Sequence, residues 1–494
     1  MEKIAIIELN EKALKLSIYK ISNGKGMLSL CKNHSVMLGE ELDRDELINP
    51  NTKNSLLEIL KVYRKLIESY NVSKIISTTT NVVLKARNYR GFLDEIYNNT
   101  GLNFVILSDE DYIKNLFNAV VNSIDSAKGI FIYVGAYSSY IVKYNRRAIL
   151  GSSIMKFGTY SLASFEGNLD ALVSSIKKDI KVDGFLQDID EDSKIVGIGD
   201  AFISAGRIAK KMQRYSLDVD NNFQLTKENM EKSYQFIKGL DLDKIKKIKG
   251  IDYDDADRVT TGFAIIKALY ETLGLKEVTI SSANLRAGLL QVNILNASQE
   301  KFNDLLTNSL ESYYEFNNDE FSINQSVYNM ATILFKQLKV MHKLSRFYVK
   351  PLRIASFMYD SGKCINSENY SKYGFDKIVY SDLAGVTHRE LLIAGFICVC
   401  QNLDDFSLND WIKYKDILTE EDLDAVRKLG IIVKLAVALN ASRKPVIQDI
   451  VCDILGDSII MKTVIDGDAT YEIIEGMKVA QDYKKVYKKT LQII

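Results

Sequence analysis

Proline, tryptophan and histidine are scarce in this chain of 494 residues, which holds 3 prolines, 1 tryptophan and 3 histidines. Net charge is also absent, because 64 basic residues balance 64 acidic ones, so no global field recruits DNA or an anionic membrane. No run approaches the ~20 apolar residues of a membrane-spanning helix. The opening MEKIAIIELN has charge on both sides of a very short apolar core, unlike a signal peptide. We therefore expect a soluble, cytoplasmic protein, and the 3 prolines beside 27 tyrosines are typical of an AT-rich bacterial genome.

Cysteine is sparse as well: the 5 cysteines form no paired framework, which indicates a reducing compartment. Cys398 and Cys400 lie in an apolar run at residues 391–400 that holds no histidine. Free cysteine usually packs as a small hydrophobic side chain, so we expect this pair to be buried rather than to bind a metal. The histidines are expected on the surface or satisfied in the core: His34, His342 and His388.

A strand-turn-strand pattern occurs twice. Residues 4–7 and 13–21 have the apolar alternation of two strands joined by a turn. The same plan recurs at residues 131–142, where the run FIYVGAYSSYIV breaks at Gly135. Such a turn directs several backbone N–H groups one way, as in an anion-binding nest. The repeat predicts two related α/β halves that face one cleft, which is the default ligand site.

Strand and helix patterns alternate between these two units, as in an α/β fold. We expect helices at residues 56–70 and 90–100, the second closed by Gly101, strands at 75–80 and 105–107, and a helix that opens at Ser108. Apolar residues at helical spacing return after residue 300, followed by an Asn-rich linker at 315–324. After Pro445 we expect strands at 446–455 and 458–465 and one long helix at 469–493.

Four stretches carry a more specific pattern. They are residues 79–88 (TTNVVLKARN), 101–111 (GLNFVILSDED), 155–162 (MKFGTYSL) and 250–290, which includes GIDYDDAD and SSANLRAGLL. In the same order, these resemble the ATSALRDARN, TGLxxxxxSGxEEA, LPLGAxRL, GLDPxRAD and SxxGLREGLL motifs of the exopolyphosphatase and guanosine pentaphosphate phosphatase (Ppx/GppA) family. The resemblance extends into the C-terminal part and so covers most of the chain.

The resemblance implies an α/β fold of the actin, sugar kinase and heat-shock ATPase type. Two ribonuclease-H-like halves, at residues 1–125 and 126–300, would be followed by an all-α HD-like domain at 301–444. A small α+β cap would complete the chain at 445–494. Family members commonly pair, so a homodimer is expected.

The resemblance also implies phosphate loops, and the chain departs from the family in each. The first loop, DIGSNS in the family, is ELNEKA here, which leaves Glu8 as a tentative metal ligand and Asn10 as a phosphate contact. The second loop, DIGGGSTE, is YVGAYSSY, which removes both carboxylates and leaves Gly135, Ser138 and Ser139 as ligand contacts.

Other positions implied by the family are changed too. The GGTA loop keeps Gly199 but gains a carboxylate at Asp200. The arginine of ATSALRDARN falls on Leu84, although Arg87 persists as a candidate phosphate contact. The general-base glutamate aligns with Asp111 or Tyr112. Asp111 and the neighbouring Glu110 are therefore the tentative catalytic residues.

The metal motifs of an HD domain are degenerate in the same way. Residues 357–362 (FMYDSG) resemble LLHDIG, but Tyr359 replaces the histidine and only Asp360 survives. Tyrosine also replaces both histidines of an HxKHS motif, at Tyr370 and Tyr373, and LADALD becomes LAVALN at residues 435–440. We expect no metal there, because one carboxylate is not a site.

Phosphoryl transfer depends on positioning and on charge neutralisation, so these combined losses predict impaired catalysis. The favoured hypothesis is a family protein whose cleft binds polyphosphate, a guanosine nucleotide or another phosphorylated ligand. One alternative is a weakly active magnesium-dependent phosphohydrolase, with magnesium as cofactor only if activity survives. The other is a structural or interaction protein that acts as a homodimer.

Overall fold

The protein is described from a computed structural model that covers residues 1–36, 38–146, 148–163, 165, 168–180, 184–187, 192–251, 256–295, 304–317 and 321–494. The chain forms two compact units. Unit 1 comprises Met1–Arg214 and Asp220–Asn308, and unit 2 comprises Tyr215–Val219 and Ser309–Ile494. The predicted boundary at residue 300, part of the linker and the centre of the GIDYDDAD motif lie outside the described residues.

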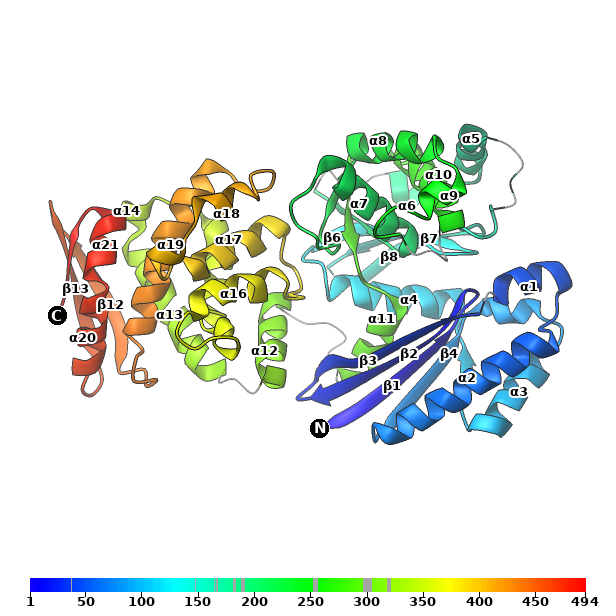
Figure 1. Cartoon of the computed structure of the whole chain (residues 1–494), viewed down its shortest axis with the longest axis horizontal. Helices are drawn as coiled ribbons and strands as arrows, with labels where there is room; N and C mark the ends of the chain where they lie inside the picture. Colours follow the sequence, from blue (N-terminus) through cyan, green and yellow to red (C-terminus); the bar gives the residue numbers. More distant parts are fainter. Residues whose placement is uncertain are drawn as a thin grey trace. The chain divides into compact units, whose positions relative to one another are not determined.

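Unit 1 starts with a five-stranded sheet in the order β3-β2-β1-β4-β5 (Figure 1). Its strands are β1 (Glu2–Leu9), β2 (Ala13–Ser22), β3 (Lys25–Ser35), β4 (Lys74–Thr79) and β5 (Phe104–Ile106). The helices of this half are α1 (Leu38–Asp45), α2 (Pro50–Ser69), the short η1 (Asn81–Lys85), α3 (Tyr89–Thr100) and α4 (Asp109–Val121). β1 runs antiparallel to β2 and parallel to β4.

A second sheet in unit 1 has the order β10-β11-β9-β6-β7-β8. Its strands are β6 (Lys128–Val134), β7 (Ser139–Asn145), β8 (Ala148–Met155), β9 (Lys194–Ile198), β10 (Gln224–Thr226) and β11 (Glu277–Ser281). The helices are α5 (Leu169–Asp179), α6 (Gly184–Gln187), α7 (Asp200–Gln213), α8 (Lys227–Lys238), α9 (Leu242–Ile245), α10 (Ala256–Thr272) and α11 (Leu285–Ile294). β6 pairs antiparallel with β7 and parallel with β9, so β8-β7-β6-β9-β11 repeats the order of the first sheet.

One apolar core joins the two sheets. It contains Ile4 and Ile6 from β1, Phe117 from α4, Phe131 from β6 and Leu289 from α11. In Figure 1, α4 and α11 lie between the sheets. The two helices cross so closely that a Cβ on Gly288 would lie 1.9 Å from the backbone oxygen of Asn115. The halves of unit 1 are therefore packed on a shared interior, which fixes the loops that face each other above it.

Local signals explain why the elements near the loops begin and end where they do. Ser108 caps α4, because its side chain accepts a hydrogen bond from the Asp111 amide. Gly101 closes α3 with a φ of 67°, a conformation that most side chains disfavour. The helices and strands expected between residues 56 and 121 are confirmed, with shifts at their ends.

Unit 2 consists of helices followed by a small sheet. The helices are α12 (Leu305–Asn317, which crosses the unit boundary), α13 (Phe321–Gln337), α14 (Lys339–His342), α15 (Val349–Phe357), α16 (Tyr370–Val379), α17 (His388–Val399), α18 (Leu408–Ile412) and α19 (Glu420–Ala438), with short turns η3 (Arg346–Tyr348), η4 (Ser361–Cys364) and η5 (Leu403–Asp405). Cys398 and Cys400 are buried, as expected. No helix among the described residues is long and apolar enough to cross a bilayer.

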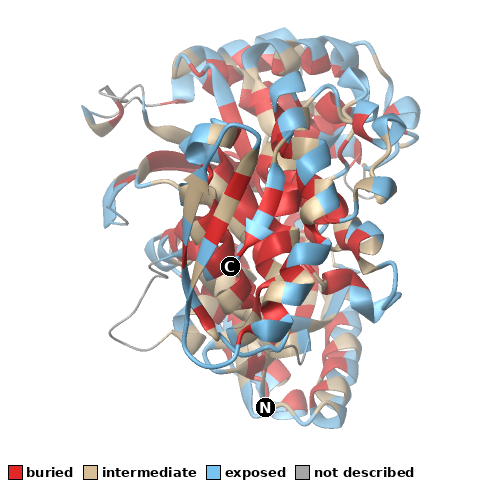
Figure 2. Ribbon diagram, turned by 90° about the vertical axis from the view of Figure 1, so that its left-hand side faces the viewer, coloured by how far each residue is buried: buried red, intermediate tan, exposed pale blue. Residues whose placement is uncertain are grey.

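The C-terminal segment differs from its prediction. The strands β12 (Ile447–Ile454) and β13 (Ser458–Ile465) are confirmed, but the single helix at 469–493 is wrong. Instead there are α20 (Thr470–Lys478), α21 (Ala480–Tyr487) and β14 (Thr490–Ile493), which pairs parallel with β13. Lys488 ends α21 in the left-handed conformation, and Leu491 and Ile493 are buried in alternation, as a strand requires. Figure 2 shows buried and exposed residues alternating along the strands near the C-terminus.

Candidate functional site

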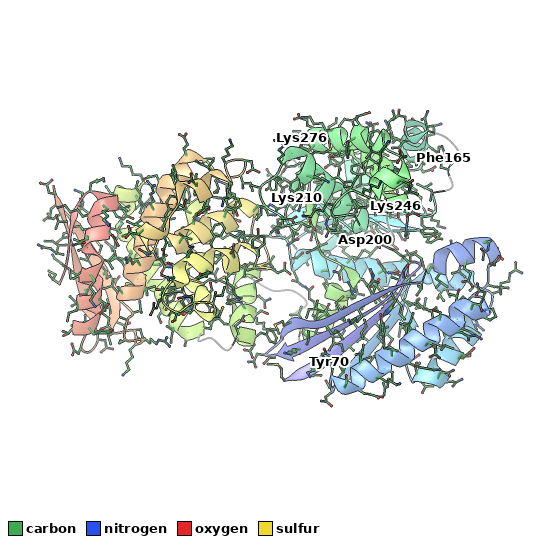
Figure 3. The ribbon with its side chains drawn as sticks, in the orientation of Figure 1. Tyr70, Phe165, Asp200, Lys210, Lys246 and Lys276 are labelled. Carbon is green, nitrogen blue, oxygen red and sulfur yellow. The ribbon has the colours of Figure 1, made fainter. Side chains whose placement is uncertain are left out.

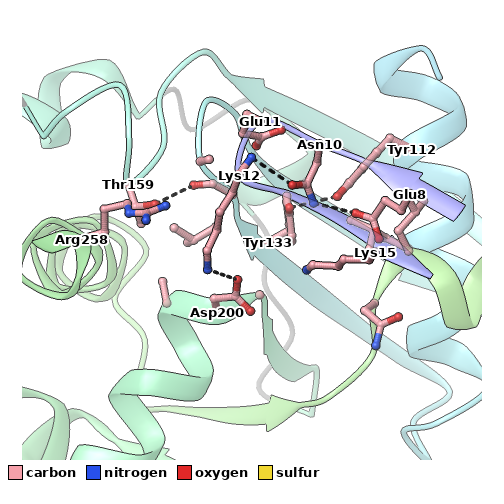
Figure 4. A pocket seen from close by; sticks show the side chains of 18 of the residues that line it. Glu8, Asn10, Glu11, Lys12, Lys15, Tyr112, Tyr133, Thr159, Asp200 and Arg258 are labelled. Carbon is pink, nitrogen blue, oxygen red and sulfur yellow. Dashed lines mark hydrogen bonds and ion pairs between the residues drawn. The ribbon is translucent and has the colours of Figure 1, made fainter. Parts of the chain in front are cut away.

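A cavity of about 120 Å³ opens between the two halves of unit 1. Both predicted turns contribute to it, since residues from the β1–β2 turn and the β6–β7 turn line it together with the starts of α7 and α11. The lining residues that carry the argument are Glu8, Asn10, Glu11, Lys12, Lys15, Tyr112, Tyr133, Gly135, Gly199, Asp200, Arg258 and Arg286. Figure 4 shows most of these side chains around the cavity. The prediction that both turns face one cleft is confirmed.

The first turn satisfies its own backbone. Asn10 Oδ1 accepts hydrogen bonds from the amides of Lys12 (3.1 Å) and Ala13 (2.8 Å). Asn10 Nδ2 donates to Glu8 Oε1 at 2.9 Å, and the Asn10 amide donates to the Ala13 carbonyl. An anion-binding nest needs such N–H groups to be available. Here Asn10 occupies them, so the turn offers few donors to a phosphate.

The second turn is also closed on itself. The Gly135 amide donates to the Ser138 carbonyl, and the carbonyls of Gly135 and Ala136 accept from the amides of Thr159 and Tyr160. A Cβ on Gly158 would lie 2.4 Å from backbone atoms of this turn, so glycine permits the contact. The carbonyls of the turn therefore pack on the segment that follows β8, and the Gly135 amide is used within the turn.

Three tyrosine rings fill the space beneath the second turn. Tyr133 stacks on Tyr140 with ring centroids 5.6 Å apart, and Tyr112 lies 5.6 Å and 5.8 Å from these two rings. The hydroxyls of Tyr112 and Tyr133 are 3.0 Å apart, and the Tyr140 hydroxyl donates to Asp109 at 2.8 Å. Burial raises the pKa of Tyr112 and Tyr133 well above its ordinary value. The Tyr112 and Tyr133 phenols are consequently neutral, and β6 carries Tyr133 near its end in place of a carboxylate.

Charged residues gather around the first turn instead. The register of the β1–β2 hairpin places Lys15 opposite Glu8. Glu8 is buried and lies 3.9 Å from Arg286 Nε, and Lys12 Nζ lies 3.6 Å from an Asp200 oxygen. The Lys15 ammonium has no hydrogen bond or ion pair with any residue that the structure describes, and Figure 4 shows it beside the cavity.

Four cations and three carboxylates thus line one cavity. The carboxylates are Glu8, Glu11 and Asp200, and the cations are Lys12, Lys15, Arg258 and Arg286. Burial raises the pKa of Glu11, and the nearby Glu8 carboxylate raises it further. Hydrogen bonds from the Glu11 amide and from Thr80 lower this pKa, but they do not offset the rise. With four cations against three carboxylates, the cavity suits an anion.

Glu8, the tentative metal ligand, already has partners within the chain. Magnesium prefers octahedral oxygen ligation with one or two carboxylates beside substrate phosphates. Glu8, the predicted ligand, is next to a guanidinium and accepts from Asn10, so a metal would compete with two donors. Among the described residues, no group of three or more His, Cys, Asp or Glu side chains is arranged to hold a metal.

The structure brings together four of the predicted site residues and leaves others apart. Glu8, Asn10, Gly135 and Gly199 line the cavity, and Ser138 lines an adjoining pocket under the tyrosines. Four other predicted residues line neither. Ser139 is fully buried and donates to the Phe157 carbonyl, Arg87 is exposed and paired with Glu46, and both Glu110 and Asp111 are exposed on the first turn of α4.

Several lining residues were not predicted as part of the site. Tyr112, the alternative alignment for the general base, faces the cavity from α4. Lys15 could have been found by counting the hairpin register from the turn, because the residue opposite Glu8 must share its face. Arg286 lies within the matched SSANLRAGLL motif, so its position was visible although its role was not.

The segment predicted to resemble an HD metal motif contains its own cation, Lys363. Asp360 accepts from Lys363 Nζ at 3.2 Å and from Asn324 at 3.3 Å. The Lys363 ammonium also lies over the rings of Tyr359 and Tyr370, at 5.5 Å and 5.1 Å from their centroids. The surviving carboxylate is therefore neutralised by the chain itself.

Comparisons with known proteins agree with this geometry at the level of the fold. A profile described as the Ppx/GppA phosphatase family matches residues 17–297. A guanosine-5'-triphosphate,3'-diphosphate pyrophosphatase of Aeromonas hydrophila subsp. hydrophila is 21% identical over 447 residues, which cover 89% of this chain and 89% of that protein. A bifunctional 3-dehydroquinate synthase/phosphatase of Fusobacterium nucleatum subsp. nucleatum is 20% identical over 308 residues, covering 58% of this chain and 46% of that protein.

Solved structures show the same fold. The Aquifex aeolicus Ppx/GppA family member has a TM-score of 0.53 at 18% identity and covers 59% of this chain and 97% of its own. An exopolyphosphatase from Cytophaga hutchinsonii has a TM-score of 0.54 at 15% identity and covers 59% of this chain and 98% of its own.

Proposed function

The chain belongs to the Ppx/GppA phosphatase family, and we propose that its cleft binds polyphosphate or a guanosine nucleotide with greatly reduced hydrolysis. One observation carries the proposal. The cavity keeps an anion-attracting set of side chains, while the chain itself engages the amides of Asn10, Lys12 and Ala13 in the first turn and that of Gly135 in the second.

Binding and catalysis make different demands on this cleft. A bound phosphate is stabilised by Lys15 and Arg286 wherever they reach it. Turnover requires donors aimed at the charge that develops in the transition state, and losing one such donor typically costs ~10²- to 10³-fold. In this cleft Asn10 holds the Lys12 and Ala13 amides, and Tyr133 stands where the family has a carboxylate. Several groups that would stabilise the transition state are therefore missing together.

The weakly active alternative has less support from the geometry. The tentative catalytic residues Glu110 and Asp111 are exposed and do not line the cavity, and Asp111 accepts from Ser108 as part of the α4 cap. Magnesium binding is not part of the proposal, because Glu8 is already paired with Arg286 and Asn10. The remaining expectations, including the domain bounds, the HD likeness of the helical region and a cytoplasmic location, stay predictions.

A homodimer is a second proposal that rests on unit 2. Four apolar side chains of β13 and α20 are more than half exposed: Val464 and Ile465 on the strand, and Tyr471 and Ile474 on the helix. The proposal is that a second copy of the chain covers exposed apolar surface on these two elements. Light scattering on the purified chain should give twice the monomer mass, and Ile474→Glu should lower it. A monomer at all concentrations would contradict the dimer.

Calorimetric titration with inorganic tripolyphosphate and with guanosine pentaphosphate tests the binding claim. Arg286→Ala should weaken binding at least tenfold, because a charge-assisted hydrogen bond contributes about 1.5–3 kcal/mol. Arg87→Ala is the matched control, since Arg87 is exposed, pairs with Glu46 and lies outside the cavity. Equal losses in both variants, or no binding by the wild type, would contradict the proposal.

A further inference from the structure

Asp200 occupies an unusual place for a carboxylate in a cleft that attracts anions. It is the first residue of α7, directly after Gly199, which has a φ of 99°. Its side chain is 73% exposed and lies 3.6 Å from Lys12 Nζ. In Figure 3 Asp200 lies on the side of the second half that faces the first sheet, and Figure 4 shows its pairing with Lys12 across the cavity.

The surroundings of Asp200 are those of a bound anion. The N-terminus of a helix carries partial positive charge and favours negative groups. Partial desolvation raises the pKa of Asp200, but Lys15, Lys12 and Arg258 together outweigh it and lower that pKa below its ordinary value. The carboxylate is therefore ionised at neutral pH, and cations from the β1–β2 hairpin and from α10 converge on it.

The Lys12–Asp200 contact also joins the two halves of unit 1. Lys12 belongs to the β1–β2 turn and Asp200 to α7, which packs on the second sheet. Because Asp200 is largely exposed, its carboxylate can rotate away from Lys12 without entering an apolar environment. An exposed ion pair of this kind is weak and is readily exchanged for another anion.

We propose that Asp200 is a built-in counter-anion that competes with the ligand's phosphate for Lys12, so that binding in this cleft proceeds by exchange of one anion for another. The inference rests on the proposed binding function and adds its regulation: Asp200 weakens the affinity and sets the ligand concentration at which the cleft is occupied. A ligand displaces Asp200 from Lys12, and Asp200 returns as the ligand leaves.

The test is calorimetric titration of the full chain with inorganic tripolyphosphate at several salt concentrations. Asp200→Asn should bind about tenfold more tightly than the wild type, because a carboxylate that competes for Lys12 is replaced by a neutral amide of the same shape. Its affinity should also fall more steeply with salt, since one more cation depends on mobile counterions. Asp200→Glu keeps the charge and should bind like the wild type. Glu58→Gln, an exposed change of equal charge on α2, should have no effect.

The outcomes separate the two proposals. If wild type and Asp200→Asn bind with equal affinity and equal salt slope, and Arg286→Ala still weakens binding, the counter-anion is refuted while the binding function stands. If neither protein binds tripolyphosphate, both are refuted, because removal of a competitor should at least expose the site. A gain that Glu58→Gln reproduces would also refute the inference, since net charge alone would explain it.

Discussion

Replacing Asn10 with glycine should strengthen phosphate binding, although it removes a residue of the site. In the wild type, Asn10 Oδ1 holds the amides of Lys12 and Ala13 at 3.1 Å and 2.8 Å. Asn10→Gly frees both N–H groups. Two hydrogen bonds to a charged phosphate contribute about 3 kcal/mol at the low end of the usual range. The added backbone freedom of glycine costs about 1 kcal/mol. The net of about 2 kcal/mol corresponds to roughly 30-fold tighter binding.

Calorimetric titration with tripolyphosphate checks this gain, and Asn10→Asp supplies the matched control. Aspartate keeps the oxygen that holds the two amides, but it replaces the Nδ2 donor with an oxygen 2.9 Å from Glu8 Oε1. Its binding should be weaker than that of the wild type. If Asn10→Gly binds no more tightly than the wild type, the engaged amides do not limit phosphate binding, and the proposed reason for reduced hydrolysis fails as well.

Three further predictions concern stability and reactivity. Asp422→Ala should lower the free energy of unfolding by about 1.5–3 kcal/mol in chemical denaturation, because it removes a fully buried carboxylate that accepts hydrogen bonds from Arg389 and Tyr348. Burial raises the pKa of Asp422, but hydrogen bonds from Arg389, Thr419 and Tyr348 lower that pKa on balance. The wild type should therefore lose this stability as the pH falls below about 4. A free energy of unfolding that does not change with pH in this range would contradict the pairing. Gly158→Ala should cost about 1–3 kcal/mol in thermal unfolding, since its Cβ meets backbone 2.4 Å away; an unchanged midpoint would mean that the turn can shift. Exposed Cys364 should react with a thiol reagent in the folded protein while Cys398 does not, because burial raises the pKa of Cys398 to about 12; equal rates would contradict its burial.

The sequence predicted the architecture of unit 1 because its signals are local. The alternation in residues 4–21 and 131–142 gave the two hairpins, and Gly101 and Ser108 marked helix ends with chemistry that depends on their immediate neighbours. β3 was not predicted, since KGMLSLCKNHS has polar residues on an exposed edge and lacks a clear alternation. The C-terminal helix was predicted too long because residues 490–493 form the strand β14 only by pairing with β13. No local sequence pattern indicates that pairing.

The site was predicted in part for a similar reason. Motif spacing located Glu8, Asn10, Gly135 and Gly199, which all line the cavity. It could not show that Asn10 folds back on the turn, or that Tyr112 and Tyr140 from separate elements complete a ring cluster with Tyr133. The tyrosine contacts depend on the packing of α4 against the second sheet, whereas the Asn10 contacts are local to the turn and were missed because an asparagine there was interpreted only as a phosphate contact.

The central claim is that this cleft holds a phosphorylated ligand without efficient hydrolysis. Phosphate release, measured by a malachite-green assay on polyphosphate and on guanosine pentaphosphate with magnesium, tests it most directly. The account predicts release near background under conditions in which tripolyphosphate binding is saturated. Robust magnesium-dependent release by the unmodified chain, abolished by Glu8→Gln, would contradict it and would show that the altered site is an active one.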